Sequence, residues 1–205
     1  SYTAPALLPD RSDVARRQAE LWGNPRRRIA VARRMYALRL GEILPHRDLD
    51  TLRGIEGSRV KTLYRLTAER YRIPWNGRHY DRAAPEATDT PNQAINHAAT
   101  AVQAAAAIAV QSLAAIPQLG FIHEDSGQSF VLDIADLFRD SITLPIAFAA
   151  ASKALGGAPD TIDRLVRREA ATVFRKQSVI PSMIDKIKVV LRMEEVDAAG
   201  SDSNA

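Results

Sequence analysis

The chain has 205 residues, of which 46% are hydrophobic, so it is long enough to bury the core of one large domain. It contains no cysteine, which excludes disulfides, thiolate metal sites and cysteine nucleophiles, so any metal must be bound by His, Asp or Glu. The net charge is +4 and is unevenly distributed, because nine arginines lie within residues 1–39 whereas residues 194–205 hold four acids and no base.

Residues 1–24 are expected to form a linker and a first helix. A second helix over about 25–40 is indicated by the cap-like Asn24, by Pro25 at the first helical position and by Gly41 as a stop. Its outer face is rich in arginine. Such a face suits a polyphosphate partner, because guanidinium groups match phosphate oxygens, but it is equally typical of a solvated helix surface.

A third helix is expected over about 48–71, where apolar residues recur at helical spacing. Glu56 lies in its middle beside Gly57, and a glycine there costs about 1 kcal/mol in helix propensity. Either something approaches the backbone closely at this point, or Glu56 simply pairs with Arg53 or Arg59 along the same helix.

A long loop containing Pro74, Gly77 and Pro85 follows, and Pro91 then opens an alanine-rich helix that ends near residue 115. The apolar middle of this helix is too short to cross a bilayer, so we interpret it as a buried core helix. Residues 1–8 lack the charged start and apolar run of a secretory signal. We therefore expect no membrane association and a cytoplasmic location.

The segment GFIHEDSGQSFVLDIADLF, residues 120–138, is expected to begin as part of a short β-hairpin or extended segment near 119–132. From Asp133 the chain should return to helix until about residue 155. Two further helices are expected, over about 160–177 and from Pro181 to about 193, followed by a disordered acidic tail over 194–205. The predicted fold is thus mainly α, with residues 1–193 forming one multi-helix domain.

Asp133 and Asp136 are three residues apart at the expected start of a helix, so both side chains could point toward one site. The pair could instead cap the helix and complement its dipole. His123 lies on the predicted extended segment, where a lone histidine is more often a core or rim group than a ligand.

Five blocks in this order closely resemble the CRISPR-associated adaptation integrase, the first of the universal Cas proteins, in its type I-E form. They are LRGIEGSRVKTLY, WNGRHYD, NQAINHA, GFIHEDSGQSFVLDIADLF and SITLPIAF. The resemblance covers about residues 25–193. It implies a helical catalytic domain of a metal-dependent DNA endonuclease and integrase, which inserts new spacers by 3′-hydroxyl attack on repeat-end phosphodiesters.

The resemblance also implies a catalytic metal site made of Glu56, His123 and Asp136, with Asp133 as an acidic neighbour. One nitrogen and two hard carboxylates suit Mg²⁺ or Mn²⁺ better than a closed structural zinc site. A divalent ion in such a site can activate the attacking hydroxyl and stabilise the leaving oxygen, so no serine or cysteine nucleophile is needed.

The partners implied by the resemblance are DNA, as a protospacer with splayed ends and a CRISPR repeat, and the second universal Cas protein, with the chain forming a homodimer. The implied DNA contacts are Arg59, Arg78, Tyr80, Arg139 and Arg164. The amino-terminal β-domain of the family is expected to be absent here. Two alternatives stay open: a catalytically silent DNA-binding or scaffold fragment of the same fold, and an unrelated helical bundle whose acids are caps and salt bridges.

Overall fold

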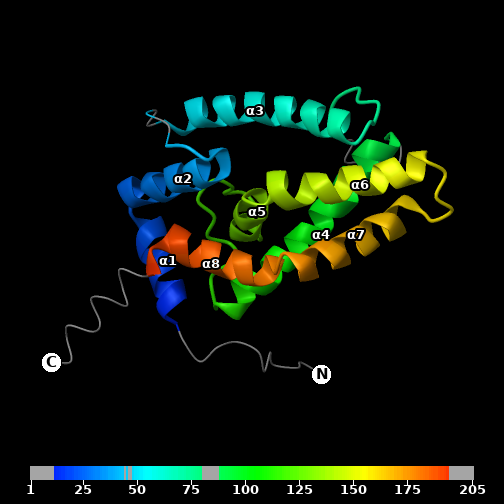
Figure 1. Cartoon of the computed structure of the whole chain (residues 1–205). Coiled ribbons are helices and arrows are strands. Elements are labelled where there is room, and N and C mark those ends of the chain that lie inside the picture. The colour runs from blue at the N-terminus through cyan, green and yellow to red at the C-terminus, as the bar shows by residue number, and fades with distance from the viewer. Residues whose placement is uncertain (1–11, 44, 46–47, 80–87, 194–205) are drawn as a thin grey trace, which may run out of the picture.

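A computed structural model of the chain describes residues 12–43, 45, 48–79 and 88–193, and within these ranges every regular element is a helix (Figure 1). The elements are α1 (Asp13–Gly23), α2 (Pro25–Leu40), α3 (Leu49–Arg70), α4 (Thr90–Ser112), α5 (Ser129–Asp136), the π-helical turn η2 (Arg139–Thr143), α6 (Leu144–Leu155), α7 (Ile162–Lys176) and α8 (Val179–Leu191). The predicted mainly α fold is confirmed.

The boundaries of the first helices follow from local capping. The side chain of Asn24 accepts a hydrogen bond from the backbone N–H of Arg27 at 3.1 Å, which starts α2. Gly41, with φ +74°, ends the same helix in the left-handed conformation that glycine adopts readily. Asp48 and Asp89 cap α3 and α4 in the same way as Asn24 caps α2. These caps are readable from sequence alone.

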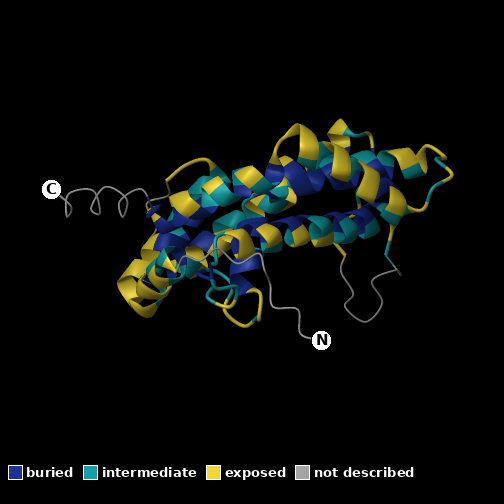
Figure 2. Cartoon of the chain, turned by 90° about the horizontal axis from the view of Figure 1, so that it is seen from below, coloured by how far each residue is buried: buried dark blue, intermediate teal, exposed yellow. Residues whose placement is uncertain are grey.

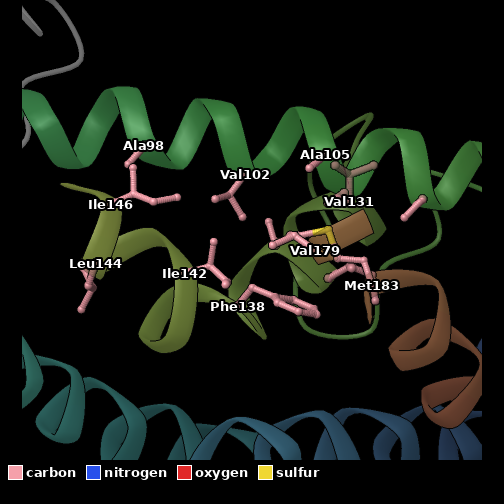
Figure 3. Packing of buried hydrophobic residues seen from close by; sticks show 14 of the residues in the cluster. Ala98, Val102, Ala105, Val131, Phe138, Ile142, Leu144, Ile146, Val179 and Met183 are labelled. Carbon is pink, nitrogen blue, oxygen red and sulfur yellow. The ribbon is translucent and has the colours of Figure 1, made fainter. Parts of the chain in front are cut away.

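Helix α4 is the centre of the fold, and α5, η2, α6, α7 and α8 all pack against it. Its alanines allow neighbouring helices to approach closely. Figure 3 shows Val102 and Ala105 of α4 facing Val131, Ile142 and Val179 from the surrounding elements. Buried residues line the inner faces of the helices and exposed residues cover the outside (Figure 2). The expectation of a central core helix is therefore confirmed.

The remaining helices complete one end and one side of this core. Helix α3 runs along one side and contacts α2 and α6, whereas α1 contacts α2 and α8 (Figure 1). Helix α2 also contacts α8. The carboxyl end of α2, the amino-terminal half of α3 and the end of α5 consequently converge, and this convergence positions the candidate site.

The predicted hairpin near 119–132 is wrong. Residues 119–128 form irregular turns, and α5 begins at Ser129, four residues before the expected helix start. Phe121 and Phe130 are buried with their rings edge to face at 5.9 Å, so their spacing reflected two core contacts rather than two paired strands. The backbone N–H groups after Gly120 bond to a side chain, that of Asp133, instead of a partner strand.

The expected single helix from Asp133 to residue 155 is interrupted. Helix α5 ends at Asp136, and in η2 the backbone N–H of Thr143 reaches the carbonyl of Phe138, five residues earlier, at 3.1 Å. Pro145 has no N–H to give to an α-helical ladder, which is consistent with a wider turn just before it. Such π-helical turns are frequent at functional sites.

The predicted tail over 194–205 and Tyr80 lie outside the described residues. Among the helices that the structure does describe, none is both long enough and apolar enough to cross a lipid bilayer.

Candidate functional site

Two carboxylates from different helices meet at one arginine. Arg39, at the end of α2, is only 6% exposed, and its Nη2 lies 2.7 Å from Oε1 of Glu56 on α3. Its Nη1 donates to Oδ2 of Asp136, the last residue of α5, at 3.3 Å. The Nη2 contact is short but poorly aligned as a hydrogen bond, and Nε has no acceptor among the described residues. Arg39 thus holds the two acids together mainly by charge.

The π-helical turn adds two more charged groups to this cluster. Arg139 pairs with the other oxygen of Asp136 at 2.5 Å. Asp140 forms no ion pair or hydrogen bond within the described part of the chain, and burial raises its pKa, an effect that Arg39 and Arg139 only partly oppose. The charge of Asp136 is therefore neutralised by two arginines in contact with it, whereas the charge of Asp140 is opposed only by the more distant charges of Arg39 and Arg139.

Asp133 is fully buried and organises the loop that carries His123. Its carboxylate accepts backbone hydrogen bonds from Phe121, Ile122 and His123 at 2.6, 3.1 and 2.9 Å. The same carboxylate bonds Nδ1 of the His123 ring at 2.8 Å. Asp133 lies mid-helix in α5, so it does not cap its own helix, and it serves instead as the acceptor for a loop that has no strand partner.

This arrangement determines the proton distribution on His123. Because the carboxylate of Asp133 accepts hydrogen bonds, Nδ1 carries a proton and Nε2 holds the lone pair of the neutral ring. The hydrogen bond to Asp133 raises the pKa of His123, burial opposes the rise, and the charge of nearby Asp136 adds to it. His123 is thus held in the tautomer of a metal ligand, within electrostatic reach of Asp136.

The chemistry of these groups fits a hard divalent ion, although their present spacing does not. No three His, Asp or Glu side chains within the described ranges are grouped so that one ion could bind them all. Arg39 lies between two of the three expected ligands and supplies the positive charge there. The carboxylate-to-histidine bond is, however, the arrangement that usually supports a metal-ligating imidazole.

Glu56 does not pair as the within-helix alternative predicted. Arg59 pairs with Glu42, and Arg53 pairs with Asp50 at 3.1 Å, so both arginines are engaged elsewhere. In addition, apart from its own helical turn, no atom of the described residues lies within 4 Å of a Cβ added at Gly57. The backbone beside Glu56 is therefore open.

A groove runs beside the charged cluster, between α2, α3 and η2. It has a volume of about 310 Å³ and is lined by Arg39, Leu40, Ser58, Arg59, Val60, Thr62, Leu63, Leu66 and Asp140. Its lining combines apolar side chains with two arginines and Asp140. Of the expected DNA contacts, Arg59 and Arg139 lie at this groove or in the cluster.

Two other expected DNA contacts are engaged away from the cluster. Arg78 donates to the side chains of Asn92 and Asn96 at 3.0 and 2.6 Å, which ties the segment after α3 to the start of α4. Arg164 is exposed on α7 and pairs with Asp160 at 3.5 Å. The structure does not bring either residue to the carboxylates.

Sequence reasoning missed Arg39 and Asp140. Arg39 is one of nine arginines in the first 39 residues, and nothing in the local pattern distinguishes it from the others. Only its contacts with residues 17 and 97 positions away single it out. For Asp140, the Pro at position 145 was a weak signal of an irregular turn, but it did not indicate which side chain would be buried.

The chain is similar to known proteins over most of its length. A family model described as "CRISPR associated protein Cas1" matches residues 36–155, a range that contains the whole charged cluster. The "CRISPR-associated endonuclease Cas1" of Escherichia coli (strain K12) is 36% identical over 196 residues, covering 95% of this chain and 63% of that protein. The protein of the same name from Geobacter sulfurreducens is 36% identical over 188 residues, covering 91% and 60%.

Solved structures show the same relationship. The "Crystal structure of TtCas1-DNA complex" matches with a TM-score of 0.81 and 32% identity, over 89% of this chain and 66% of that one. A "Casposase bound to integration product" matches with a TM-score of 0.71 but 13% identity, over 91% and 67%, which shows a shared fold only. The chain spans about three fifths of the length of the two curated relatives described above.

Proposed function

The chain belongs to the Cas1 family, and from this premise we propose that it is the helical part of a metal-dependent DNA endonuclease and integrase of CRISPR adaptation, in its type I-E form. One observation carries the proposal. Glu56 and Asp136, which lie on different helices, share the guanidinium of Arg39, and Asp133, one helical turn before Asp136, binds the ring of His123. A helical bundle whose acids were only caps would have no reason to bring these groups together.

Glu56, His123 and Asp136 would hold Mg²⁺ or Mn²⁺. Such an ion supplies charge stabilisation for the attacking 3′-oxygen and the leaving oxygen during cleavage or joining of a phosphodiester. The donor set supports this, since it combines two carboxylates with an imidazole whose Nδ1 proton is already held by Asp133. Arg39 occupies the position of a cation between the carboxylates, so the site already accommodates positive charge.

The neighbouring residues would bind and orient the DNA strand. Arg139, in the charged cluster, and Arg59, in the lining of the groove, would provide positive charge for backbone phosphates. The apolar side chains that line the groove, among them Leu63 and Leu66, would offer a surface for an unpaired base. We expect Arg78 and Arg164 to contribute less, because their guanidinium groups lie away from the carboxylates.

The partners of the proposed activity are a protospacer with splayed ends and a CRISPR repeat. The solved TtCas1 neighbour is a complex with DNA, which supports a DNA substrate for this chain. In the full assembly we expect a homodimer joined by the second universal Cas protein. The reaction would take place in the cytoplasm of a prokaryotic cell.

A second candidate function is a catalytically silent DNA-binding or scaffold protein of the same fold. The observation that favours it is the Arg39 contact, which leaves no ready cluster of three ligands in the described residues. In that case the basic groove would still bind DNA, but the carboxylates would serve only to position arginines.

Titration with Mn²⁺ followed by thermal unfolding separates these functions. We expect the melting temperature of the wild-type chain to rise with Mn²⁺, because an ion that binds only the native state stabilises it. His123→Ala should lose this rise. His97→Ala is the matched control, since His97 lies on α4 and should leave the response unchanged.

The same proteins should then be assayed for cutting and joining DNA with splayed ends. Ion-dependent stabilisation together with DNA turnover supports the nuclease and integrase. Stabilisation without turnover would favour the silent scaffold, and a wild-type melting temperature that is indifferent to Mn²⁺ and Mg²⁺ would overturn the metal site itself.

A further inference from the structure

The loop that carries His123 is held on its far side by helix α1. Gln18 of α1 is completely buried, and its amide Nε2 donates to the carbonyls of Ile116 and Leu119, both at 2.9 Å. Its Oε1 accepts from the backbone N–H of Ile116 at 2.7 Å. One side chain therefore satisfies three backbone groups of a turn about one hundred residues away.

Trp22 extends this attachment one helical turn further along α1. Its Nε1 donates to the carbonyl of Gly120 at 3.0 Å, three residues before His123. The guanidinium of Arg28 lies 4.8 Å from the Trp22 ring centre and pairs with Glu124 at 2.6 Å. The two residues that flank the His123 region, Gly120 and Glu124, are thus both anchored to the amino-terminal helices.

Because Gln18 is buried, its hydrogen bonds fix the conformation of the turn in addition to filling space in the core. Gln18 shares the buried stripe of α1 with Val14 and Leu21, where an aliphatic side chain would satisfy packing alone. An amide is tolerated at such a position only because its hydrogen bonds are made. An aliphatic replacement would leave the N–H of Ile116 and the carbonyl of Leu119 unpaired, whereas the carbonyl of Ile116 would keep its bond from the N–H of Leu119 at 3.2 Å. The loop conformation and the Gln18 amide therefore specify each other.

The opposite side of the loop is held by α5. Asp133 binds three successive backbone N–H groups, and the N–H of Phe130 donates to the carbonyl of Pro117 at 2.8 Å. At Gly120 the two sides meet so closely that an added Cβ would lie 2.3 Å from the carbonyl oxygen of His123. With both sides held, the position of the His123 ring depends on α1 as well as on α5.

We infer that Gln18 and Trp22 are positioning residues for His123, and that α1 sets the position and orientation of its imidazole ring relative to Asp136. This inference rests on the proposed role of His123 as a ligand. It assigns a task to a helix that lies outside the residues matched by the family model, which begin at residue 36. The contact is to the loop backbone, so it acts on His123 without touching the ion or DNA.

Gln18→Met and Trp22→Phe test the inference. Gln18→Met keeps the side-chain length and removes all three hydrogen bonds, and Trp22→Phe keeps an aromatic ring while removing only the Nε1 donor. Arg17→Met is the matched control, because Arg17 lies on the same helix but donates to the carbonyl of Leu191 in α8. All variants are studied as the whole 205-residue chain, at a temperature where each is folded.

Two readouts distinguish positioning from simple stability. We expect the Kd for Mn²⁺, measured by calorimetry, to rise about tenfold in Gln18→Met and less in Trp22→Phe, as found when supports of a metal-ligating histidine are removed. The ring nitrogens of His123 should also change their ¹⁵N chemical shifts in metal-free protein, together with faster hydrogen exchange at the amides bound to Asp133. Arg17→Met should change neither readout.

The possible failures are separable. If wild type does not bind Mn²⁺ but the ring shifts still respond to Gln18→Met, the proposed metal site fails and the positioning contact stands. If wild type binds Mn²⁺ and both α1 variants bind it equally well with unchanged His123 spectra, the inference is overturned. Trp22→Phe keeps the test decisive should Gln18→Met fail to fold.

Discussion

Replacing Arg39 by Met should lower the free energy of unfolding without a divalent ion, and a divalent ion should restore most of that loss. Arg39→Met keeps the length of the buried stem and removes the charge that bridges Glu56 and Asp136. In the presence of a chelator the variant retains two carboxylates that are only 17% and 21% exposed. Their mutual repulsion and partial burial are then uncompensated, apart from the contact between Arg139 and Asp136.

The expected loss follows from this geometry. Removing one partner of a buried ion pair costs about 3–5 kcal/mol when the remaining charge is left unpaired. Because Arg139 still neutralises Asp136 and both acids keep some solvent contact, we expect a loss at or just below the low end, about 2–3 kcal/mol. An ion at one hundred times its Kd returns about 2.7 kcal/mol, so saturating Mn²⁺ should restore most of the lost stability.

The assay is urea unfolding at a fixed pH, with EDTA and with increasing Mn²⁺. Wild type should gain less from a given Mn²⁺ concentration than Arg39→Met, because the ion must first displace the guanidinium. Arg59→Met is the control: Arg59 lines the same groove, is exposed and, within the described ranges, pairs only with Glu42, so the free energy of unfolding of this variant should lie within about 0.5 kcal/mol of wild type. Equal gains from Mn²⁺ in wild type and Arg39→Met would refute the idea that the arginine and the ion share the carboxylates.

Three further predictions concern the same site. Because the hydrogen bond to Asp133 raises the pKa of His123, the stabilisation from the charged ring should be complete below about pH 6.5 and lost as pH rises through the higher folded-state pKa. The urea midpoint measured across this pH range should fall accordingly, and in His123→Asn the midpoint should depend less on pH. Gly120→Ala should destabilise by about 3 kcal/mol, since its Cβ would meet backbone at 2.3 Å, and an unchanged urea midpoint would contradict the close approach. Gly57→Ala should raise the free energy of unfolding by about 1 kcal/mol but weaken the binding of splayed DNA, measured by fluorescence anisotropy. A gain in stability with unchanged DNA affinity would show that DNA does not approach α3 at Gly57.

The helices were predictable because their signals are local. Asn24, Asp48 and Asp89 each accept a hydrogen bond from a backbone N–H three residues ahead, so the cap and its partner are adjacent in the sequence. The alanine-rich pattern of α4 likewise contained enough information to predict a central buried helix. The wrong prediction near 119–132 arose where the backbone is satisfied by a side chain, since no periodic pattern records that.

The candidate ligands were a different case, because Glu56, His123 and Asp136 came from a family resemblance and not from their spacing. Their spacing alone did not decide whether Asp133 and Asp136 cap a helix or belong to a catalytic site. The structure gives them separate tasks: Asp133 holds the His123 loop and ring, whereas Asp136 pairs with Arg39 and Arg139.

What the sequence by itself determined is where the capped helices α2, α3 and α4 begin, which faces are apolar, and which residue types are available for a site. What only the tertiary structure decided is which arginine of the basic amino-terminal region meets the carboxylates, and that Gln18 supports a loop near residue 120. The physical reason is the separation along the chain between the groups that interact. Caps and periodicity depend on neighbours within a turn or two, whereas a buried charge or amide takes its role from partners that only the folded chain brings into contact.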